Sequence, residues 1–380
     1  MHIALVRRFC SLKKAGAERY CVNLFRQLQQ LGHQVTVIGE GIDDELKSEV
    51  EFLPVPVNRL TSWTKNKSFA ENVSRVAKTR RFDLVHGLSR ADGLDTYRLT
   101  DPMQTHWVNV YYRNPLMRWL QHWNPRHRMI LHLERQLYES GRVRRVITQS
   151  QLDTRLLTEY FRIPAERIRR IPNGVNTTIF HPGVQSQRHE VRAEWKIAPD
   201  EPLLVFASMD FRRKGLDTLL AALARQQTPT KLLVLGDGDI RKYQQRAQSL
   251  GVGPNVLFAG RQAGIQKFYG AADLFVLPTI YEPFPNVNLE AMACGLPVIT
   301  TQTAGGADIV VPGENGFLIP DAWAVEELAE QIKQFFRLPA ASRKIMSNNC
   351  VHTASRFTVE ENARQTVAVF EEVLREKFRV

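Results

Sequence analysis

The stretch YEPFPNVNLEAMACGLP, at residues 281–297, gives the clearest indication of how this chain folds. The apolar run at 273–277 just before it predicts a buried strand, and a helix is expected near 287–294. Glu282 would then lie on the loop at the carboxyl end of the strand, and Glu290 would lie one turn into the helix. A strand that leads directly into a helix is the repeating unit of a parallel sheet covered by helices.

Strand–helix alternation continues from this stretch to both ends of the chain. The later series has strands at 203–207, 231–235, 256–259, 273–277 and 297–300, with helices near 215–225, 239–250, 265–271 and 287–294. The earlier series has strands at 2–6, 34–38, 51–57, 82–86 and 145–148, with helices near 17–31, 68–79 and 151–161. Two series predict two Rossmann-like sheets. Because parallel sheets bind ligands beyond the carboxyl ends of their strands, we expect the site in the cleft between the sheets.

The boundary between the two series is expected at IPNG, residues 171–174, where proline and Asn-Gly interrupt any helical period. We therefore predict an N-terminal domain at 1–172 and a C-terminal domain at 173–357. A last helix is expected near 358–376. Thr358 is its expected N-cap, and Glu361 follows three residues later, as in a capping box.

Glu282 and Glu290 can both face one ligand that lies across the start of the predicted helix. A carboxylate suits a hydroxyl-rich ligand because it accepts two or more O–H hydrogen bonds. The helix N-terminus suits a phosphate. These residues therefore favour a ligand that carries both groups. For an isolated pair of glutamates, the commoner explanation is a helix-dipole contact for one and a solvated loop position for the other.

The segment SMDFRRKG, at 208–215, places cations between a predicted strand and a predicted helix. Lys214 beside Gly215 suits a diphosphate on which charge develops as it leaves. Arg213 or Arg212 would supply a second cation. A helix start that is basic by chance is a weaker explanation, because cations there oppose the helix dipole.

Composition is that of a folded protein: 380 residues suit two domains, with 43% hydrophobic and 24% charged residues. The four cysteines form no CxxC motif, which suits a reducing cytosol. The apolar run at 2–6 precedes Arg7 and Arg8 instead of following basic residues, so we expect a strand and not a secretory signal. No run approaches the roughly 18 apolar residues of a membrane-spanning helix. These features predict a cytoplasmic protein.

The net charge of +12 is concentrated in one segment. Residues 106–145 contain eight arginines and two glutamates, a net charge of +6. Such a segment favours anionic lipid, a phosphorylated glycan or nucleic acid as a partner. The alternative is a solvated surface that only maintains solubility.

The motifs together resemble those of the retaining glycosyltransferases of the GT-B fold, in glycosyltransferase family 4. Residues 281–297 resemble the E-x7-E signature of that family, and NVLFAGR at 255–261 resembles its strand and loop around the nucleobase. GGAD at 305–308, GENGFL at 313–318 and IPNGV at 171–175 resemble three further motifs. The resemblance covers nearly the whole chain. It implies two Rossmann-like domains facing a cleft, with the last helix returning to the N-terminal, acceptor-binding domain.

The resemblance also implies roles for single residues in the donor site. Glu282 would lie by the donor sugar, and Glu290 would bind the ribose hydroxyls. Lys214 would bind the phosphates with Arg213 or Arg212, since Met209 stands where many relatives have an arginine. The remaining expected donor contacts are Arg261, Phe284, Asn286, Val287 and Gly16, the last in the loop KKAGAER at 13–19, where glycine would let the backbone approach the phosphates.

Asp101 is the expected catalytic residue of the N-terminal domain. Many relatives have a histidine against the donor sugar, and Asp101 appears at the matching position here, with Asp95 and His106 nearby. The segment GLDTY at 93–97 resembles the lipopolysaccharide core glucosyltransferase I group, in which an aspartate replaces that histidine. His106 is the second candidate, because such a histidine is more often an ordinary, partly buried one.

The favoured interpretation is a retaining transferase that moves a hexose from UDP-glucose or UDP-N-acetylhexosamine to a membrane-attached glycan such as a lipopolysaccharide core. In the front-face mechanism that the resemblance implies, the leaving diphosphate helps to deprotonate the acceptor on the same face. Neither a metal nor another cofactor is expected, because the nearest acidic pair, Asp237-Gly238-Asp239, resembles a strand-to-helix turn.

Three alternatives stay open at this point. The first is a family 4 transferase that acts on another polysaccharide or lipid with a different nucleotide sugar. The second is a dinucleotide-dependent oxidoreductase, although the first strand–helix loop lacks G-x-G-x-x-G. The third is a basic nucleic-acid-binding protein, although no recognised binding motif is present.

An amphipathic segment inside the basic region predicts contact with a membrane. Asn114 and Pro115 start a helix in which Leu116, Trp119, Leu120 and Trp123 share one face, and Pro125 ends it. Tryptophan beside arginine suits a lipid headgroup layer. The alternative is that this face packs onto its own domain. We expect a peripheral protein on the inner face of the cytoplasmic membrane, with an anionic surface and a UDP-sugar as partners and no nucleic acid.

Overall fold

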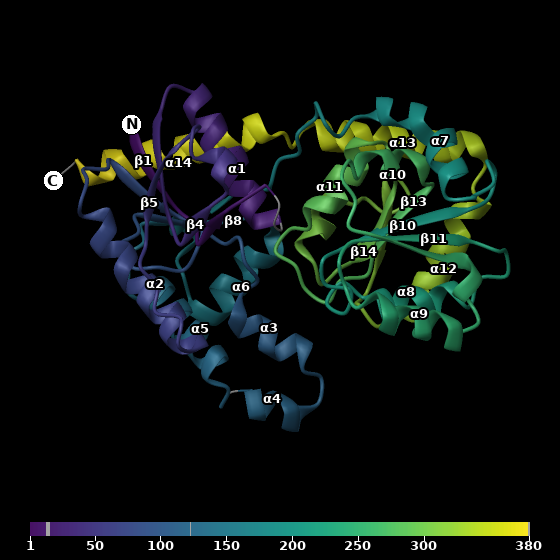
Figure 1. Cartoon of the computed structure of the whole chain (residues 1–380), viewed down its shortest axis with the longest axis horizontal. Helices are drawn as coiled ribbons and strands as arrows, with labels where there is room; N and C mark the ends of the chain where they lie inside the picture. The colour runs from purple at the N-terminus through teal and green to yellow at the C-terminus, as the bar shows by residue number, and fades with distance from the viewer. Residues whose placement is uncertain (13–15, 122, 379–380) are drawn as a thin grey trace. The chain divides into compact units, whose positions relative to one another are not determined.

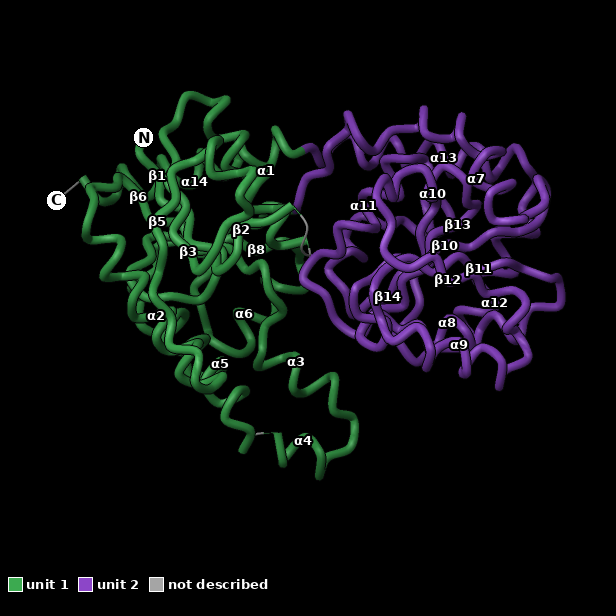
Figure 2. The backbone as a smooth tube through the Cα atoms, viewed as in Figure 1, with its two compact units in different colours: residues 1–172, 359–380 green, residues 173–358 purple. Residues whose placement is uncertain are grey.

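The computed structural model describes residues 1–12, 16–121 and 123–378. The chain forms two compact units, coloured green and purple in Figure 2. Unit 1 comprises Met1–Pro172 and Val359–Val380, and unit 2 comprises Asn173–Thr358. The chain therefore passes between the units twice.

Unit 1 is built on a seven-stranded, fully parallel sheet with the strand order β5-β3-β1-β6-β7-β8-β9 (Figure 1). Its strands are β1 His2–Val6, β3 Gln34–Gly39, β5 Glu51–Pro54, β6 Leu84–Gly87, β7 Thr96–Arg98, β8 Arg145–Thr148 and β9 Ile168–Arg170. A second, two-stranded sheet pairs β2 (Phe9–Cys10) with β4 (Gly41–Ile42). The strand order reverses between β1 and β6, which is where sheets of this kind bind ligands.

The helices of unit 1 begin where polar side chains satisfy free backbone N–H groups. Thr61 and Thr64 form a capping box before α2, and the Ser150 side chain accepts a hydrogen bond from the Asp153 N–H at the start of α6. The helices are α1 Gly16–Gln30, α2 Ser62–Ala77, α3 Gln104–Tyr111, α4 Pro115–Gln121, α5 Pro125–Glu139, α6 Gln151–Phe161 and α14 Val359–Lys377.

Unit 2 repeats the architecture with a six-stranded, fully parallel sheet in the order β12-β11-β10-β13-β14-β15. The strands are β10 Leu203–Ala207, β11 Lys231–Leu235, β12 Val256–Gly260, β13 Leu274–Leu277, β14 Val298–Thr301 and β15 Gly316–Ile319. The helices are α7 Arg188–Glu194, α8 Leu216–Leu223, α9 Ile240–Ser249, α10 Gln266–Ala271, α11 Asn286–Ala293, α12 Val325–Arg337 and α13 Ala340–Ser355. Here the strand order reverses between β10 and β13.

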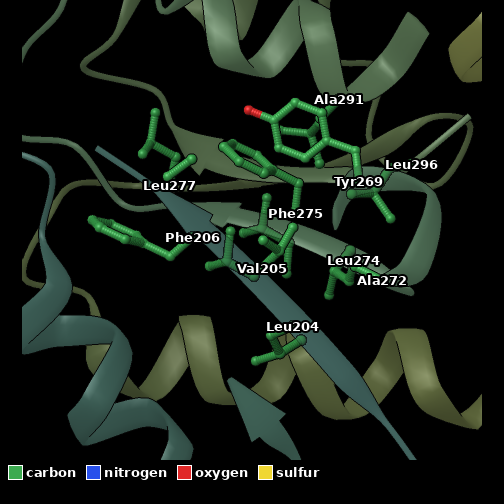
Figure 3. Packing of buried hydrophobic residues seen from close by; sticks show 14 of the residues in the cluster. Leu204, Val205, Phe206, Tyr269, Ala272, Leu274, Phe275, Leu277, Ala291 and Leu296 are labelled. Atoms are coloured by element: carbon green, nitrogen blue, oxygen red, sulfur yellow. The ribbon is translucent and has the colours of Figure 1, made fainter. Parts of the chain in front are cut away.

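The core of unit 2 surrounds the two central strands. Every residue of β10 and of β13 is buried, which explains why both are continuous apolar runs. Figure 3 shows Phe206, Tyr269 and Phe275 among the aliphatic side chains of this core, and the rings of Tyr269 and Phe275 meet edge to face at 5.7 Å. This packing holds the carboxyl ends of β10 and β13 in place.

The C-terminal helix α14 belongs to unit 1, where it lies beside α1 (Figure 1). Ala363, Phe370 and Val373 share a hydrophobic cluster with residues of β1 and α1. The hydroxyl of Tyr20 donates a hydrogen bond of 2.9 Å to Asn362. Helix α14 is therefore part of the fold of unit 1.

The structure confirms the predicted α/β class with two parallel sheets, and it corrects several elements. Strand β6 begins at Leu84 instead of residue 82, and α2 begins at Ser62 instead of residue 68. The sequence pattern does not indicate β7 or β9, because a strand of three residues is too short to show a period. It also does not indicate α3, α5, α7, α12, α13 or β15. Among the described residues, every helix is too short or too polar to cross a membrane.

Candidate functional site

The candidate site of unit 2 lies at the reversal of strand order, beyond the carboxyl ends of β10 and β13. Two loops meet there, at 208–215 after β10 and at 278–285 after β13. The carbonyl of Arg213 accepts hydrogen bonds from the Ile280 N–H at 2.9 Å and from the Thr279 hydroxyl at 3.3 Å. These bonds join the two loops, so the side chains on them are held together.

Gly215 makes the close approach of the two loops possible. Its φ is +78°, and a Cβ at this position would lie 2.0 Å from the carbonyl oxygen of Pro278. Only glycine therefore fits at this point without a backbone shift. Its neighbour Lys214 is consequently held against the chain that leaves β13.

Glu282 joins two cations from the first loop. Its Oε2 lies 2.8 Å from Nη1 of Arg213 and 2.7 Å from Nζ of Lys214. The side chain of Lys214 is 9% exposed, and burial lowers its pKa to about 8 although the Glu282 charge acts in the opposite direction. Lys214 is therefore mainly protonated at neutral pH, and its pKa of about 8 lies only slightly above that pH.

Glu290 lies on α11, near the start of that helix. It is 7% exposed. The loop before α11 is fixed by a hydrogen bond of 2.8 Å from the Gly305 N–H to the carbonyl of Glu282. The structure thus confirms the predicted placement, with Glu282 on the loop and Glu290 one turn inside the helix. Both carboxylates flank the N-terminal turn of α11, which can bind an anion.

Three asparagines lie at or near α11; Asn286 is an expected donor contact, whereas the sequence motifs do not indicate a role for Asn173 or Asn288. The amide of Asn173 donates a 2.5 Å hydrogen bond to Oδ1 of Asn286, the first residue of α11. Asn288 is fully buried, and no hydrogen-bond partner for its amide atoms lies within the described residues. A Cβ on Gly306 would lie 2.7 Å from that amide nitrogen. The sequence did contain one indication of this role, because Asn288 is a polar residue among apolar neighbours in the predicted helix.

The other expected donor contacts differ in how far their side chains are exposed to solvent. Phe284 is 4% exposed and belongs to the hydrophobic core, where its ring packs. Val287 is partly buried and packs against the same core. Arg212 and Arg261 are exposed, and Arg261 directly follows β12. Arg213, directly before Lys214, forms an ion pair with Glu282.

Asp101 lies in unit 1, just beyond the carboxyl end of β7. Its Oδ2 is 3.3 Å from Nη1 of Arg7, and Nη2 of Arg7 is 3.0 Å from Glu18. Burial alone would raise the pKa of Asp101, but Arg7 and Arg90 lower it below its usual value. Asp101 is therefore a fixed anion. The sequence motifs do not identify Arg7 as the partner of Asp101. The two arginines that follow the first strand, Arg7 and Arg8, were the available indication of a charged site there.

Asp95 and His106 do not join Asp101. Asp95 lies at the amino end of β7, where its carboxylate accepts the Val85 N–H at 2.8 Å and pairs with Lys377 at 2.7 Å. The expectation that Asp95 lies near Asp101 is therefore wrong. His106 lies on α3 and is 3.3 Å from the Tyr160 hydroxyl. Burial lowers the pKa of His106 to about 4, helped by Arg155, so the ring is neutral at pH 7.

The start of α3 is anchored by a buried carboxylate that the sequence analysis does not identify. Glu134 on α5 is fully buried and pairs with Arg90 at 2.7 Å. It also accepts hydrogen bonds from the N–H groups of Gln104 at 2.6 Å and Thr105 at 3.0 Å. A negative charge at a helix N-terminus is favourable. Glu134 therefore fixes the position of α3 and of His106.

Gly16 is the first residue of α1. The residues before it in the expected glycine loop, 13–15, lie outside the described residues. Among the described residues, no cluster of three or more His, Cys, Asp or Glu side chains is arranged to hold a metal ion.

Two family models match the chain, one in each half. Residues 15–179 match the model described as Glycosyltransferase Family 4, and residues 187–352 match the model described as Glycosyl transferases group 1. The boundary between the two matches falls near the change from unit 1 to unit 2.

Curated and solved proteins show similarity over nearly the full chain. Lipopolysaccharide glucosyltransferase WaaG of Escherichia coli is 26% identical over 341 residues, which covers 87% of this chain and 89% of that protein. The crystal structure of a WaaG glycosyltransferase superposes with a TM-score of 0.84 at 24% identity, over 97% of this chain and 99% of that one. HepE of Anabaena, in complex with UDP-glucose, superposes with a TM-score of 0.74 at 20% identity, over 98% of this chain and 100% of that one.

Proposed function

The chain belongs to the GT-B glycosyltransferases that join a family 4 domain to a group 1 domain, and we propose that it transfers a hexose from a UDP-sugar to a membrane-attached glycan. UDP-glucose is the first candidate donor and UDP-N-acetylhexosamine the second. The proposed acceptor is a lipopolysaccharide core, since the Escherichia coli relative is a lipopolysaccharide glucosyltransferase. The observation that carries the proposal is the meeting of Glu282, Arg213 and Lys214 beside the N-terminal turn of α11.

Glu290 supports binding of the nucleoside part of the donor. Its carboxylate is almost fully buried near the start of α11, where it can accept hydrogen bonds from the two ribose hydroxyls. Arg261, after β12, would lie by the nucleobase.

Lys214 and Arg213 support binding of the diphosphate. Both cations lie within 2.8 Å of one carboxylate oxygen, so an anion can contact both at once. The negative charge on the diphosphate grows as the bond to the sugar breaks, and two preformed cations stabilise that charge. We propose that these side chains supply the stabilisation without a metal ion. EDTA should then leave turnover unchanged, and loss of activity that magnesium or manganese restores would contradict this.

Glu282 and Asp101 would orient the sugar and the acceptor. Glu282 would contact the sugar hydroxyls, and Asp101, held ionised by Arg7, would contact the reacting sugar from unit 1. We propose that transfer retains the anomeric configuration, with the leaving diphosphate taking the acceptor proton on the same face. In this mechanism the protein positions the sugar and the acceptor and stabilises the developing charge, and no side chain forms a covalent bond to the sugar.

Helix α4 supports peripheral contact with the inner face of the cytoplasmic membrane. It has no buried residue, and it protrudes from the rest of unit 1 (Figure 1). Leu116, Trp119 and Leu120 on α4 are 64%, 56% and 45% exposed, and Trp123 beyond its end is 65% exposed. The predicted extension of this helix to Pro125 is wrong, because α4 ends at Gln121 and α5 begins at Pro125. These residues do not pack onto their own domain, and arginines flank them in the sequence.

Thermal-shift measurements with UDP-, GDP-, ADP- and CMP-linked sugars test the proposed donor. A ligand that binds only the folded state raises the melting temperature by mass action, so the true donor should give the largest shift. The expected result is stabilisation by UDP-glucose or UDP-N-acetylglucosamine. A larger shift with a guanosine, adenosine or cytidine nucleotide would contradict a UDP-sugar donor.

A further inference from the structure

One oxygen of Glu282 occupies a position between two cations where a phosphate oxygen could equally bind. Oε2 lies 2.8 Å from Nη1 of Arg213 and 2.7 Å from Nζ of Lys214. These are the distances of charge-assisted hydrogen bonds to a carboxylate or to a phosphate. A phosphate oxygen cannot occupy this point while Oε2 of Glu282 holds it, so the carboxylate and a diphosphate compete for the position between the two cations.

We propose that Glu282 is a specificity-determining residue that blocks the diphosphate position until a sugar-bearing nucleotide gives its carboxylate another set of partners. The inference rests on the proposed function, since it assumes a nucleoside diphosphate sugar as donor. In the free protein, Glu282 pairs with both Arg213 and Lys214. When the donor binds, its phosphates replace the carboxylate on both cations, and the carboxylate turns to the hydroxyls of the sugar.

The energetic consequence differs for the donor and for the product UDP. UDP alone takes the two cations from Glu282 and offers no hydroxyls in return. The Glu282 side chain is only 18% exposed, so water compensates its charge poorly. A nucleotide sugar supplies hydroxyl donors for the displaced carboxylate. Glu282 should therefore favour the complete donor over the product, which also helps UDP to leave after transfer.

Asp210 offers a matched control for the charge of Glu282. Its Oδ2 lies 3.5 Å from Nε of Arg213, and its side chain is 52% exposed. Asp210→Asn removes one negative charge near the two cations, as Glu282→Gln does, and leaves the 2.7 Å ion pair between Lys214 and Glu282 in place. In Asp210→Asn the side-chain oxygen that accepts the Arg213 N–H at 3.1 Å is kept.

Calorimetric titration of three proteins with UDP, UDP-glucose and inorganic pyrophosphate tests the proposal. The proteins are the unmodified chain, Glu282→Gln and Asp210→Asn, all near pH 6.5. This pH is chosen because the loss of Glu282 would lower the pKa of Lys214 further, and the lysine must stay protonated in every variant. Melting temperatures of the three proteins establish that each is folded.

In Glu282→Gln, UDP and pyrophosphate should bind about tenfold more tightly, in line with the loss of one competing charged contact. The preference for UDP-glucose over UDP should fall by a similar factor. Asp210→Asn should stay within about twofold of the unmodified chain, as an exposed charge contributes little.

Two outcomes separate the inference from the proposed function. Pyrophosphate needs the two cations but no nucleoside, so unchanged or weaker pyrophosphate binding in Glu282→Gln overturns the inference whatever UDP does. An equal gain in Asp210→Asn overturns it as well, because the effect would then be one of general charge. If the unmodified chain binds pyrophosphate but neither UDP nor UDP-glucose, the proposed donor is wrong and the competition at Glu282 is still measured.

Discussion

Lys214 illustrates at the scale of one residue how burial and charge act against each other. Burial removes water from the ammonium group and lowers its pKa to about 8, while Glu282 limits the shift. Glu282, Arg213 and Asp210 are the charged groups that act on it. A bound diphosphate would add negative charge and raise the pKa again. Proton uptake and phosphate binding at Lys214 are therefore linked.

This linkage predicts how UDP affinity depends on pH. Because the free lysine titrates near pH 8 and the bound lysine titrates higher, affinity should be full below about pH 8 and should fall above it, by up to about tenfold per pH unit. Calorimetric dissociation constants between about pH 7 and pH 9 measure the effect, and this range avoids the titration of the uracil ring of UDP. Lys214→Arg is the control, since arginine stays protonated and its curve should be level. A level curve for the unmodified chain would contradict a phosphate role for Lys214.

Asp101 and Arg7 form a second pair whose charges depend on each other. Arg7 is 6% exposed in its side chain, and Asp101, Glu18 and the Leu88 carbonyl all contact it. Replacing Asp101 with asparagine keeps an oxygen for Arg7 and leaves Glu18 as the counter-charge. Stability should therefore change by only about 1 kcal/mol, the value of one hydrogen bond.

Turnover of Asp101→Asn should nevertheless fall, by roughly 10²-fold, if the charge contacts the reacting sugar. Steady-state kinetics with the true acceptor measure this change, and UDP affinity and melting temperature serve as controls. Turnover equal to that of the unmodified chain would make Asp101 a structural partner of Arg7. Attention would then move to His106, which is neutral at pH 7.

Helix α4 has an apolar face that the described residues of unit 1 leave largely exposed. The rings of Trp119 and Trp123 lie 6.1 Å apart in an edge-to-face arrangement, and both are more than half exposed. Such a helix usually gains its stability from a surface that it contacts. The neighbouring arginines favour an anionic surface, whose attraction weakens at high salt.

Replacing Trp119 and Trp123 together with serine tests this contact. Binding to anionic phospholipid vesicles, measured by co-sedimentation at low salt, should weaken about tenfold or more because two interfacial aromatic anchors are lost. The melting temperature should stay nearly unchanged, since neither ring is in the core. Trp63→Ser on α2, where the tryptophan is 36% exposed, is the control and should leave vesicle binding unaltered. Unchanged binding of the double variant would contradict membrane contact by α4.

At the scale of the whole molecule, the segment that completes unit 1 follows the whole of unit 2 in the sequence. The last helix returns Ala363, Phe370 and Val373 to the cluster around β1 and α1. The main hydrophobic cluster of unit 2, in contrast, takes no residue beyond 357 among those described. Folding of unit 1 therefore requires both ends of the chain, whereas unit 2 is continuous in sequence.

A chain that stops at Thr358 should accordingly lose the stability of unit 1 and keep that of unit 2. Each large buried side chain that is removed costs roughly 2–5 kcal/mol. The loss of α14 thus approaches the whole stability of a domain, about 5–15 kcal/mol. Differential scanning calorimetry should show the transition of unit 2 alone. Two transitions at unchanged temperatures would show that α14 contributes little to unit 1.

Much of the fold could be predicted from the sequence because strands that are buried on both faces leave continuous apolar runs. The runs at 203–207 and 273–277 are β10 and β13 within one residue, and they place Glu282, Glu290 and the Lys214 loop at one edge of a sheet. The order of the elements and the motifs beside them were enough to predict the enzyme class. Short strands such as β7 and helices with mixed faces such as α3 leave no comparable pattern.

Only the tertiary structure decided which side chains meet. Glu282 bonds to Arg213 and Lys214, 69 and 68 positions away, and Arg7 reaches Asp101 across 94 positions. Such pairs depend on strand order and on close backbone contacts such as that of Gly215, which local sequence does not encode. The exposure of α4 is likewise a property of its surroundings. An apolar helical face has the same sequence pattern whether it packs on a core or faces solvent. The period shows which residues share a face, but it does not show what that face contacts.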